Sequence, residues 1–239
     1  GNIVDNGPNP SYVYTTSGNY IITLVVSNSV GCTATTTHTI KVLNNPFGIL
    51  SAANSVGCSP FLVNFTNSSI SIGNGSPLAS FTTTFSDDNT SVTTNSVNSP
   101  ISHTFNGTGT YFATMVAIDQ FGCESVPANV PITITKPIAF YTVPNVLCNN
   151  DTIQAINSST GVGDLSYEWF LNANSFSIDT NASVNISVPN PVGLSTPFIL
   201  SLIVADSNGC TDTLLQTINV STPHAIPSYT FSGAVLNVN

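Results

Sequence analysis

The sequence contains almost no positive charge: arginine is absent, and Lys41 and Lys136 are the only lysines among 239 residues. Charged residues make up 5% of the chain, against about 25% in ordinary soluble domains. Because two cations cannot neutralise a phosphate backbone, we expect no binding to nucleic acid. The same deficit removes the basic patch with which many proteins attach to anionic lipid.

Long apolar runs are also missing. No stretch approaches the ~20 residues that span a bilayer, so we expect no membrane insertion in this segment. No charged region followed by an apolar core opens the chain, and its first residues resemble the middle of a domain. We therefore expect an internal segment of a longer protein. Hydrophobic residues nevertheless make up 41% of the chain, which is enough for a buried core. The uncharged Ser-, Thr- and Asn-rich surface is typical of secreted proteins, so we expect an extracellular or cell-surface location.

The residue sets that carry catalysis are absent as well. The histidines His38, His103 and His224 lack metal-ligand spacing, and no Cys-x-x-Cys occurs. There is no Gly-x-Ser-x-Gly motif and no phosphate-binding loop. We expect neither an enzyme nor a cofactor.

One acidic pair, Asp87 and Asp88, is a weak candidate for a metal site. Calcium takes six to eight oxygen ligands, and two adjacent aspartates are more often simply part of a turn. Among the aromatic residues, Trp169 could stack on a sugar ring if it were exposed. Its place in a strand that packs the core favours burial instead.

The strongest signal in the sequence is an internal repeat. An aromatic residue precedes the cysteine of a Gly-Cys pair by twelve positions in three places, and these cysteines are 91 and 87 residues apart. The three pairs are Tyr20 and Cys32, Tyr111 and Cys123, and Phe198 and Cys210. A second class of cysteine, Cys58 and Cys148, recurs after 90 residues.

These spacings predict the domain boundaries. Residues 1–43 form the C-terminal part of one repeat, 44–135 and 136–221 are complete repeats, and 222–239 hold the first strand of the next.

Within each repeat, short segments alternate apolar and polar residues. Tyr20, Ile22, Leu24 and Val26 form one apolar face, and a Thr-rich strand returns over 33–42 after a turn. No window predicts an amphipathic helix. Several short strands in about 90 residues are typical of an immunoglobulin-like sandwich, so we predict an all-β chain of tandem β-sandwiches stacked end to end.

The segments that precede the long predicted strand of a repeat resemble a known family. Pro100, His103 and Phe105, followed by Gly109 and Tyr111, fit the Pro-x-His-x-Tyr and Gly-x-Tyr segments of polycystic-kidney-disease (PKD)-type repeats. Residues 10–14 and 18–20 fit the same pattern. The family's Trp-Asp-Phe-Gly-Asp-Gly signature is degraded to Phe-Ser-Asp-Asp at 85–88 and to Trp-Phe at 169–170. The resemblance implies a seven-strand immunoglobulin-like fold and says little about function.

Arrays of this composition resemble the large surface proteins of Bacteroidetes-type bacteria, including gliding and attachment adhesins. The repeat architecture and the absence of a catalytic residue set predict a structural or adhesive stalk or filament segment that acts as a rigid spacer or adhesin. Its partners would be neighbouring repeats and surface glycans or other cell-surface proteins. The resemblance implies O-glycosylation at Asp-Thr-aliphatic sequences, which makes Thr152 and Thr213 candidates. The alternative is a glycan- or protein-binding accessory module of a secreted hydrolase.

The topology of such a sandwich limits how the cysteines can pair. The two cysteine classes fall at opposite ends of a repeat, ~25 Å apart for strands of about eight residues, whereas a disulfide needs Cα atoms within about 7 Å. Stacked repeats would instead bring Cys58 beside Cys210, and this inter-repeat disulfide is our hypothesis. Cys32, Cys123 and Cys148 would then have partners outside the segment. Buried free thiols are the alternative.

Overall fold

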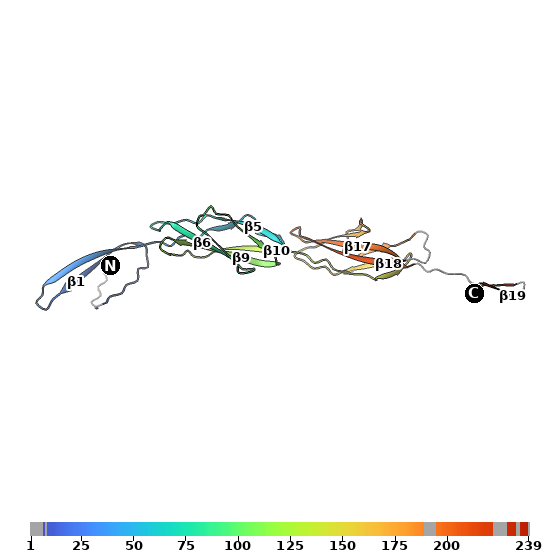
Figure 1. Ribbon diagram of the computed structural model, residues 1–239, viewed down its shortest axis with the longest axis horizontal. Coiled ribbons are helices and arrows are strands. Elements are labelled where there is room, and N and C mark those ends of the chain that lie inside the picture. The colour runs from blue at the N-terminus through green and yellow to red at the C-terminus, as the bar shows by residue number, and fades with distance from the viewer. Residues whose placement is uncertain (1–6, 8, 189–194, 222–228, 233–234, 239) are drawn as a thin grey trace. The chain divides into compact units, whose positions relative to one another are not determined.

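The computed structural model describes residues 7, 9–188, 195–221, 229–232 and 235–238. Every regular element in these residues is a β-strand (Figure 1). The chain divides into two compact units: one comprises residues 1–55 and 60–133, and the other residues 56–59 and 134–239. The described residues contain no helix long and apolar enough to cross a membrane.

A hairpin of two ten-residue strands, β1 (Gly18–Ser27) and β2 (Thr33–Val42), comes first along the chain. The strands are antiparallel, with Gly18 opposite Val42 and Tyr20 opposite Ile40. Both are present where the alternating pattern predicted them.

The first sandwich is built from eight strands in two sheets. One sheet has the order β3-β5-β8 and the other the order β4-β10-β9-β6-β7. The strands are β3 (Leu50–Ala52), β4 (Val56–Cys58), β5 (Phe61–Asn67), β6 (Leu78–Phe85), β7 (Ser91–Thr94), β8 (Ile101–Phe105), β9 (Gly109–Asp119) and β10 (Ala128–Thr135).

The second sandwich repeats this plan strand for strand. Its sheets have the orders β11-β13-β16 and β12-β18-β17-β14-β15. The strands are β11 (Tyr141–Thr142), β12 (Val146–Cys148), β13 (Thr152–Asn157), β14 (Ser166–Leu171), β15 (Asn174–Ser177), β16 (Ala182–Asn185), β17 (Ser195–Ala205) and β18 (Thr211–Ser221). The predicted fold class, tandem immunoglobulin-like β-sandwiches, is confirmed.

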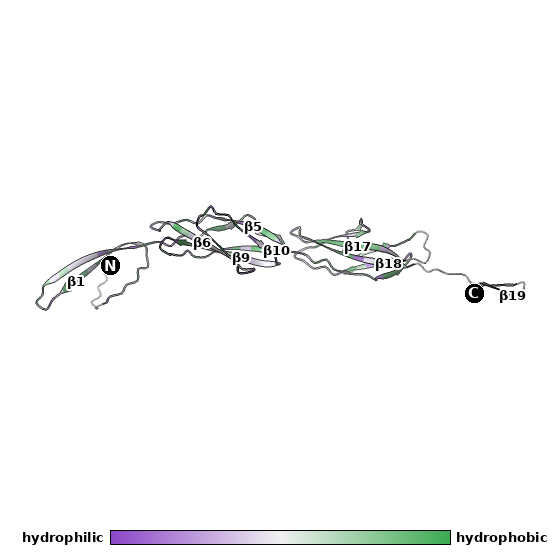
Figure 2. Ribbon diagram, viewed as in Figure 1, coloured by the Kyte–Doolittle hydropathy of each residue, from purple (hydrophilic) through white to green (hydrophobic). Residues whose placement is uncertain are grey.

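The same alternating positions form the core in both sandwiches. In β17, Leu200, Leu202 and Val204 are fully buried. In β9 the matching residues, counted back from the Gly-Cys pair, are Ala113, Met115 and Ala117, which are also fully buried. Figure 2 shows β5, β6 and β17 as largely hydrophobic strands. In β1 the matching Ile22, Leu24 and Val26 are exposed, because the described residues of that hairpin supply no second sheet to cover them.

A polar turn after the third strand of each sandwich also recurs. The side chain of Asn67 accepts hydrogen bonds from the backbone N–H and the hydroxyl of Ser69 at 3.0 and 2.6 Å. Asn157 accepts the same two bonds from Ser159 at 2.9 and 2.6 Å. The repeat read from the sequence therefore extends to individual side-chain contacts.

Near the C-terminus, β19 (Tyr229–Ser232) pairs antiparallel with β20 (Val235–Val238). A single strand was expected over 222–239. Part of that range, 222–228, 233–234 and 239, lies outside the described residues. The four predicted repeat ranges stay predictions.

Candidate functional site: the Gly-Cys turns and their cysteines

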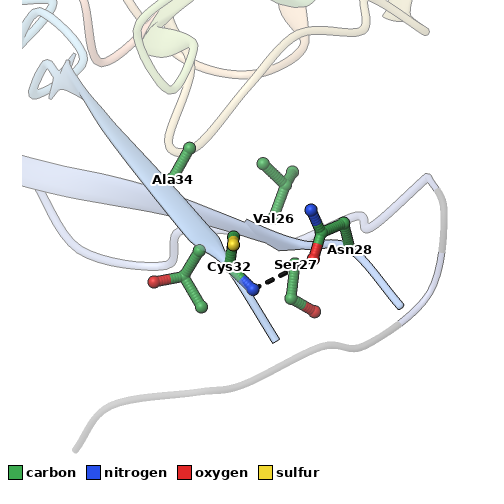
Figure 3. A pocket seen from close by; sticks show the side chains of 6 residues that line it. Val26, Ser27, Asn28, Cys32 and Ala34 are labelled. Carbon is green, nitrogen blue, oxygen red and sulfur yellow. Dashed lines mark hydrogen bonds between the residues drawn. The ribbon is translucent and has the colours of Figure 1, made fainter. Parts of the chain in front are cut away.

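Each Gly-Cys pair closes a turn that is organised by one side-chain oxygen. The Oδ1 atom of Asn28 accepts hydrogen bonds from the backbone N–H groups of Val30 and Cys32 at 3.1 and 2.9 Å. Figure 3 shows Asn28 beside Cys32 at the end of the β1–β2 hairpin, with the second of these bonds dashed. A short acceptor side chain that bonds backbone two residues ahead is a common turn-forming device.

The other two turns repeat this arrangement with aspartate in place of asparagine. Asp119 accepts from Phe121 and Cys123, both at 2.9 Å. Asp206 accepts from Asn208 and Cys210, again both at 2.9 Å.

The glycine before each cysteine is required by the backbone. Gly31, Gly122 and Gly209 have φ values of 87°, 83° and 78°. This left-handed region strains residues that carry a Cβ atom. The Gly-Cys sequence therefore specifies the turn, and the turn fixes where the cysteine lies.

The structure brings Cys58 and Cys210 together in a disulfide, with their Cα atoms 5.3 Å apart. Cys58 ends β4, and Cys210 precedes β18 in the second sandwich. Cys210 is 1% exposed. Both cysteines fall in the second compact unit, which includes residues 56–59.

The environment of this disulfide includes one buried hydroxyl group. Thr135 is 2% exposed, and its Oγ1 atom lies 3.1 Å from the Cys210 sulfur. Because a disulfide sulfur carries no proton, the threonine is the donor in this pair. The same oxygen accepts a hydrogen bond of 3.3 Å from the Asn208 side chain. Thr135 therefore contacts two residues of one Gly-Cys turn.

The other three cysteines are free thiols in the described structure: Cys32 and Cys148 are exposed, and Cys123 is half-buried. Burial, and after it the charge and hydrogen bond of Asp119, raise the pKa of the Cys123 thiol. Cys123 and Phe121 line a surface hollow together with Lys41 and Leu43.

The acidic pair proposed as a weak metal site lies beside a histidine. One ligand atom from each of Asp87, Asp88 and His103 can be chosen so that all three lie within 4.8 Å of one another. The His103 Nε2 atom lies 2.8 and 3.0 Å from the two carboxylate oxygens of Asp87, and 4.0 Å from Asp88. Asp88 accepts hydrogen bonds from the backbone and the hydroxyl of Thr90, and these two bonds lower its pKa. The two closest groups thus satisfy each other as an Asp–His pair.

His103 also stacks on Phe85, with ring centroids 4.0 Å apart and planes 6° apart. This packing gives the histidine a structural role. The sequence did not indicate that it would meet Asp87, which is 16 residues away.

Both candidate glycosylation sites are exposed: Thr152 lies in β13 and Thr213 in β18. The aspartate before each threonine is engaged with the backbone. Asp151 accepts a hydrogen bond from the N–H of Cys148, and Asp212 accepts one from Ala139, both at 2.9 Å. The Asp-Thr pairs therefore also have a structural reason to exist.

Trp169 is fully buried, and its ring N–H donates to the backbone oxygen of Asp179 at 2.9 Å. The predicted burial of this residue is confirmed. It is not available to stack on a sugar.

No protein-family model and no curated protein matches the chain. Solved structures with a similar fold include fibronectin(III)-like modules of CbhA from Clostridium thermocellum, at 13% identity and a TM-score of 0.31, over 74% of this chain and 95% of that chain. An I-band fragment of titin is similar at 12% identity and a TM-score of 0.43, over 78% of this chain and 68% of that one. A 1.5-MDa bacterial ice-binding adhesin is similar at 14% identity and a TM-score of 0.35, over the same shares. These likenesses concern the fold alone.

Proposed function

We propose that the chain is a segment of a stalk or filament in a large secreted cell-surface protein, in which PKD-type repeats act as a rigid spacer or adhesin. The observation that carries this proposal is the disulfide between Cys58 and Cys210, which joins the predicted repeat 44–135 to the predicted repeat 136–221. A covalent link from one repeat to the next serves an array that must keep its length under load. Proteins that keep disulfides are typically extracellular, which supports the proposed location.

The PKD assignment is supported by how the motif residues of the first sandwich pack. Asp87 of the degraded signature pairs with His103 of the Pro-x-His segment. Tyr111 of the Gly-x-Tyr segment stacks on Phe105, with ring centroids 5.7 Å apart. Residues that define the family pattern along the sequence are therefore neighbours in space.

The low charge and the Thr- and Asn-rich surface support an origin among Bacteroidetes-type surface proteins. In that setting, Thr152 and Thr213 would carry O-glycans, and the partners would be neighbouring repeats and surface glycans or proteins. Peptide mass mapping of the protein from its native source tests the modification. Unmodified peptides at both threonines would contradict it.

The disulfide defines a load path. It closes a loop with a sequence separation of 152 residues. When the two ends of the chain are pulled, tension passes from Cys58 directly to Cys210, and the strands inside the loop carry none of it. The proposed spacer would thus resist extension even where a sandwich unfolds.

Single-molecule force spectroscopy tests this mechanism. A fully extended chain gains about 3.3–3.6 Å per residue, so the closed loop hides roughly 500–550 Å of contour length. We expect this length to appear only after reduction, or in the double variant Cys58→Ser and Cys210→Ser. Equal extension of oxidised and reduced chains would overturn the proposal. Selective binding to a glycan array by the oxidised chain would favour the accessory-module alternative.

A further inference from the structure

We propose that Cys148 and Ser221 form a docking site for the Gly-Cys turn of another repeat, which is closed by a disulfide. The inference rests on the proposed function, because it specifies how one repeat recognises the next. The group that binds this site is a Gly-Cys turn like those of Cys32, Cys123 and Cys210.

The first step is the equivalence of two strand ends. β12 runs parallel to β18 and places Cys148 opposite Ser221, and the N–H of Asn149 donates to the Ser221 carbonyl at 3.1 Å. In the first sandwich β4 lies beside β10, and the N–H of Ser59 donates to the Thr135 carbonyl at 3.1 Å. Cys148 and Ser221 therefore stand where Cys58 and Thr135 stand one repeat earlier.

A second pair of backbone hydrogen bonds, two residues earlier in β18 and in β10, fixes the same register. The N–H of Asn219 donates to the carbonyl of Asn145 at 3.1 Å, and the N–H of Thr133 donates to that of Ser55 at 2.8 Å. The three residues of β4 and of β12 also share one exposure pattern, with both end residues exposed and the middle one half-buried.

The second step is that the earlier copy of this site is occupied. The Cys210 turn bonds Cys58 and also contacts the Thr135 hydroxyl through Asn208 and the Cys210 sulfur. Ser221 keeps a hydroxyl group at the equivalent position. It is half-buried, whereas Thr135 is 2% exposed. The later site thus has the chemistry of the earlier one without a turn seated on it in the described structure.

The Gly-Cys turn at Cys123 shows the opposite situation, in which the turn is described without a cysteine-bearing strand beside it. The hollow at Cys123 is lined by Leu43, and Leu43 directly follows Val42, the last residue of β2. The register of the hairpin places Leu43 where Thr135 and Ser221 stand in the sandwiches, since Val42 faces Gly18 as Val220 faces Thr196. In the described residues β2 has β1 as its only partner, so no described strand runs beside the end of β2 as β4 runs beside β10. At Cys148 the neighbouring strands β12 and β18 are both described, and the cysteine is a free thiol.

The bond forms by thiol–disulfide exchange with a small disulfide such as oxidised glutathione. The Cys148 thiolate attacks glutathione disulfide and releases one glutathione thiolate. The turn cysteine then attacks the Cys148 sulfur and releases the second. Two protein thiols are oxidised to one disulfide, and one glutathione disulfide is reduced to two thiols.

The chain contains both halves, so the full-length protein tests the site. At high concentration in a glutathione redox buffer, we expect head-to-tail multimers in which Cys148 of one copy bonds Cys32 of the next, because the Cys32 turn is exposed. Peptide mapping under non-reducing conditions should identify this link as the main intermolecular product. Cys148→Ser and Cys32→Ser should each lower multimer yield at least tenfold, and Cys123→Ser should lower it less than either, because Leu43 already lines the hollow at Cys123. Monomer alone, or Cys148–Cys148 dimers as the main product, would overturn the proposal.

A second variant tests recognition apart from thiol reactivity. Ser221→Val should slow formation of the Cys148–Cys32 link several-fold, Ser221→Thr should preserve it, and neither should change the rate at which Cys148 reacts with a small aromatic disulfide reagent. Equal cross-linking rates in all three proteins would show that Cys148 is merely an exposed thiol. Cys148→Ser should keep the hidden contour length that Cys58–Cys210 produces. Failure at Cys148 is thereby distinguishable from failure of the stalk proposal.

Discussion

The two complete sandwiches share one strand order and fill their cores differently. In the first, Phe85 lies between Phe65 and Phe105, at centroid distances of 5.7 and 6.3 Å. In the second, Tyr141 meets Trp169 edge-on at 5.1 Å. One core is therefore a cluster of phenylalanines and the other a tyrosine–tryptophan pair.

The strand registers show where the two cores diverge. Trp169 lies opposite Leu202, and Thr83 lies opposite Met115 at the equivalent place in the first sandwich. A fully buried threonine thus replaces a fully buried tryptophan. The difference shows that alternation and turn residues are enough to specify this topology, while the largest core side chain can lie at different positions in the two sandwiches.

The largest expected effect comes from emptying each core in turn. Trp169→Ala should lower the free energy of unfolding of the second sandwich by about 3–5 kcal/mol, because it leaves a large cavity. Phe85→Ala is the matched change in the first sandwich and should cost a similar about 3–5 kcal/mol. Circular dichroism during urea unfolding measures both.

Trp169 is the only tryptophan, so its fluorescence reports on the second sandwich alone. Phe85→Ala should leave the fluorescence transition in place while the circular-dichroism signal gains an earlier step. A fluorescence midpoint that shifts as far as in a core variant of the second sandwich would show that the two cores unfold as one.

The next effect compares the bonded Gly-Cys turn at Cys210 with a free one at Cys123. Replacing both Cys58 and Cys210 with serine should destabilise the second compact unit by about 2–4 kcal/mol, the typical contribution of a disulfide. Cys123→Ser, in the first sandwich, should change stability by less than about 0.5 kcal/mol. Thermal unfolding of the two proteins with and without reductant measures the difference. A double-serine variant that unfolds like the oxidised parent would contradict the structural role of the bond.

A third contrast concerns the first strand of each sandwich. Tyr141 lies opposite Asn157 as Leu50 lies opposite Asn67, but only the tyrosine has a hydroxyl, which donates to the Leu200 carbonyl at 2.6 Å. Tyr141→Phe removes this buried hydrogen bond, so we expect the second sandwich to lose about 0.5–1.5 kcal/mol of stability.

The same tyrosine gives the second sandwich a dependence on alkaline pH. Burial raises the pKa of Tyr141 to about 12, so the folded state favours the neutral phenol. Its contribution is fully present below pH 10, where the unfolded chain also keeps the proton, and is lost as pH rises toward 12. Tyr141→Phe should flatten this part of the stability profile between pH 9 and 12. An unchanged slope there would assign the alkaline loss to other groups.

Much of this architecture could be predicted from the sequence, because its signals are local. The alternation in 20–26 and the Gly-Cys turns depend on neighbouring residues, and repeated spacing then predicted repeat boundaries, which stay predictions. The pairing of cysteine classes followed from strand length. The Asp87–His103 pair, the contact of Thr135 with Cys210, and the exchange of Trp169 for Thr83 could not be predicted, since each depends on which distant side chains fill a shared space. Composition alone does not determine that packing.

The smallest expected effect concerns Thr83, the buried threonine that stands where the second sandwich has Trp169. The Oγ1 atom of Thr83 is buried and has no hydrogen-bond partner among the described residues. An unpaired buried hydroxyl is unfavourable, and valine has nearly the same shape without it. Thr83→Val should therefore stabilise the first sandwich by about 1 kcal/mol. The adjacent Thr82 is the matched control, because its hydroxyl pairs with that of Thr93 at 3.1 Å on the surface. Thr82→Val should be neutral or slightly destabilising, within about 0.5 kcal/mol. Urea unfolding measures both changes. If Thr83→Val destabilises the protein while Thr82→Val does not, the Thr83 hydroxyl has a hydrogen-bond partner such as an ordered water. In that case the buried threonine contributes a hydrogen bond to the first core at the position that Trp169 fills in the second.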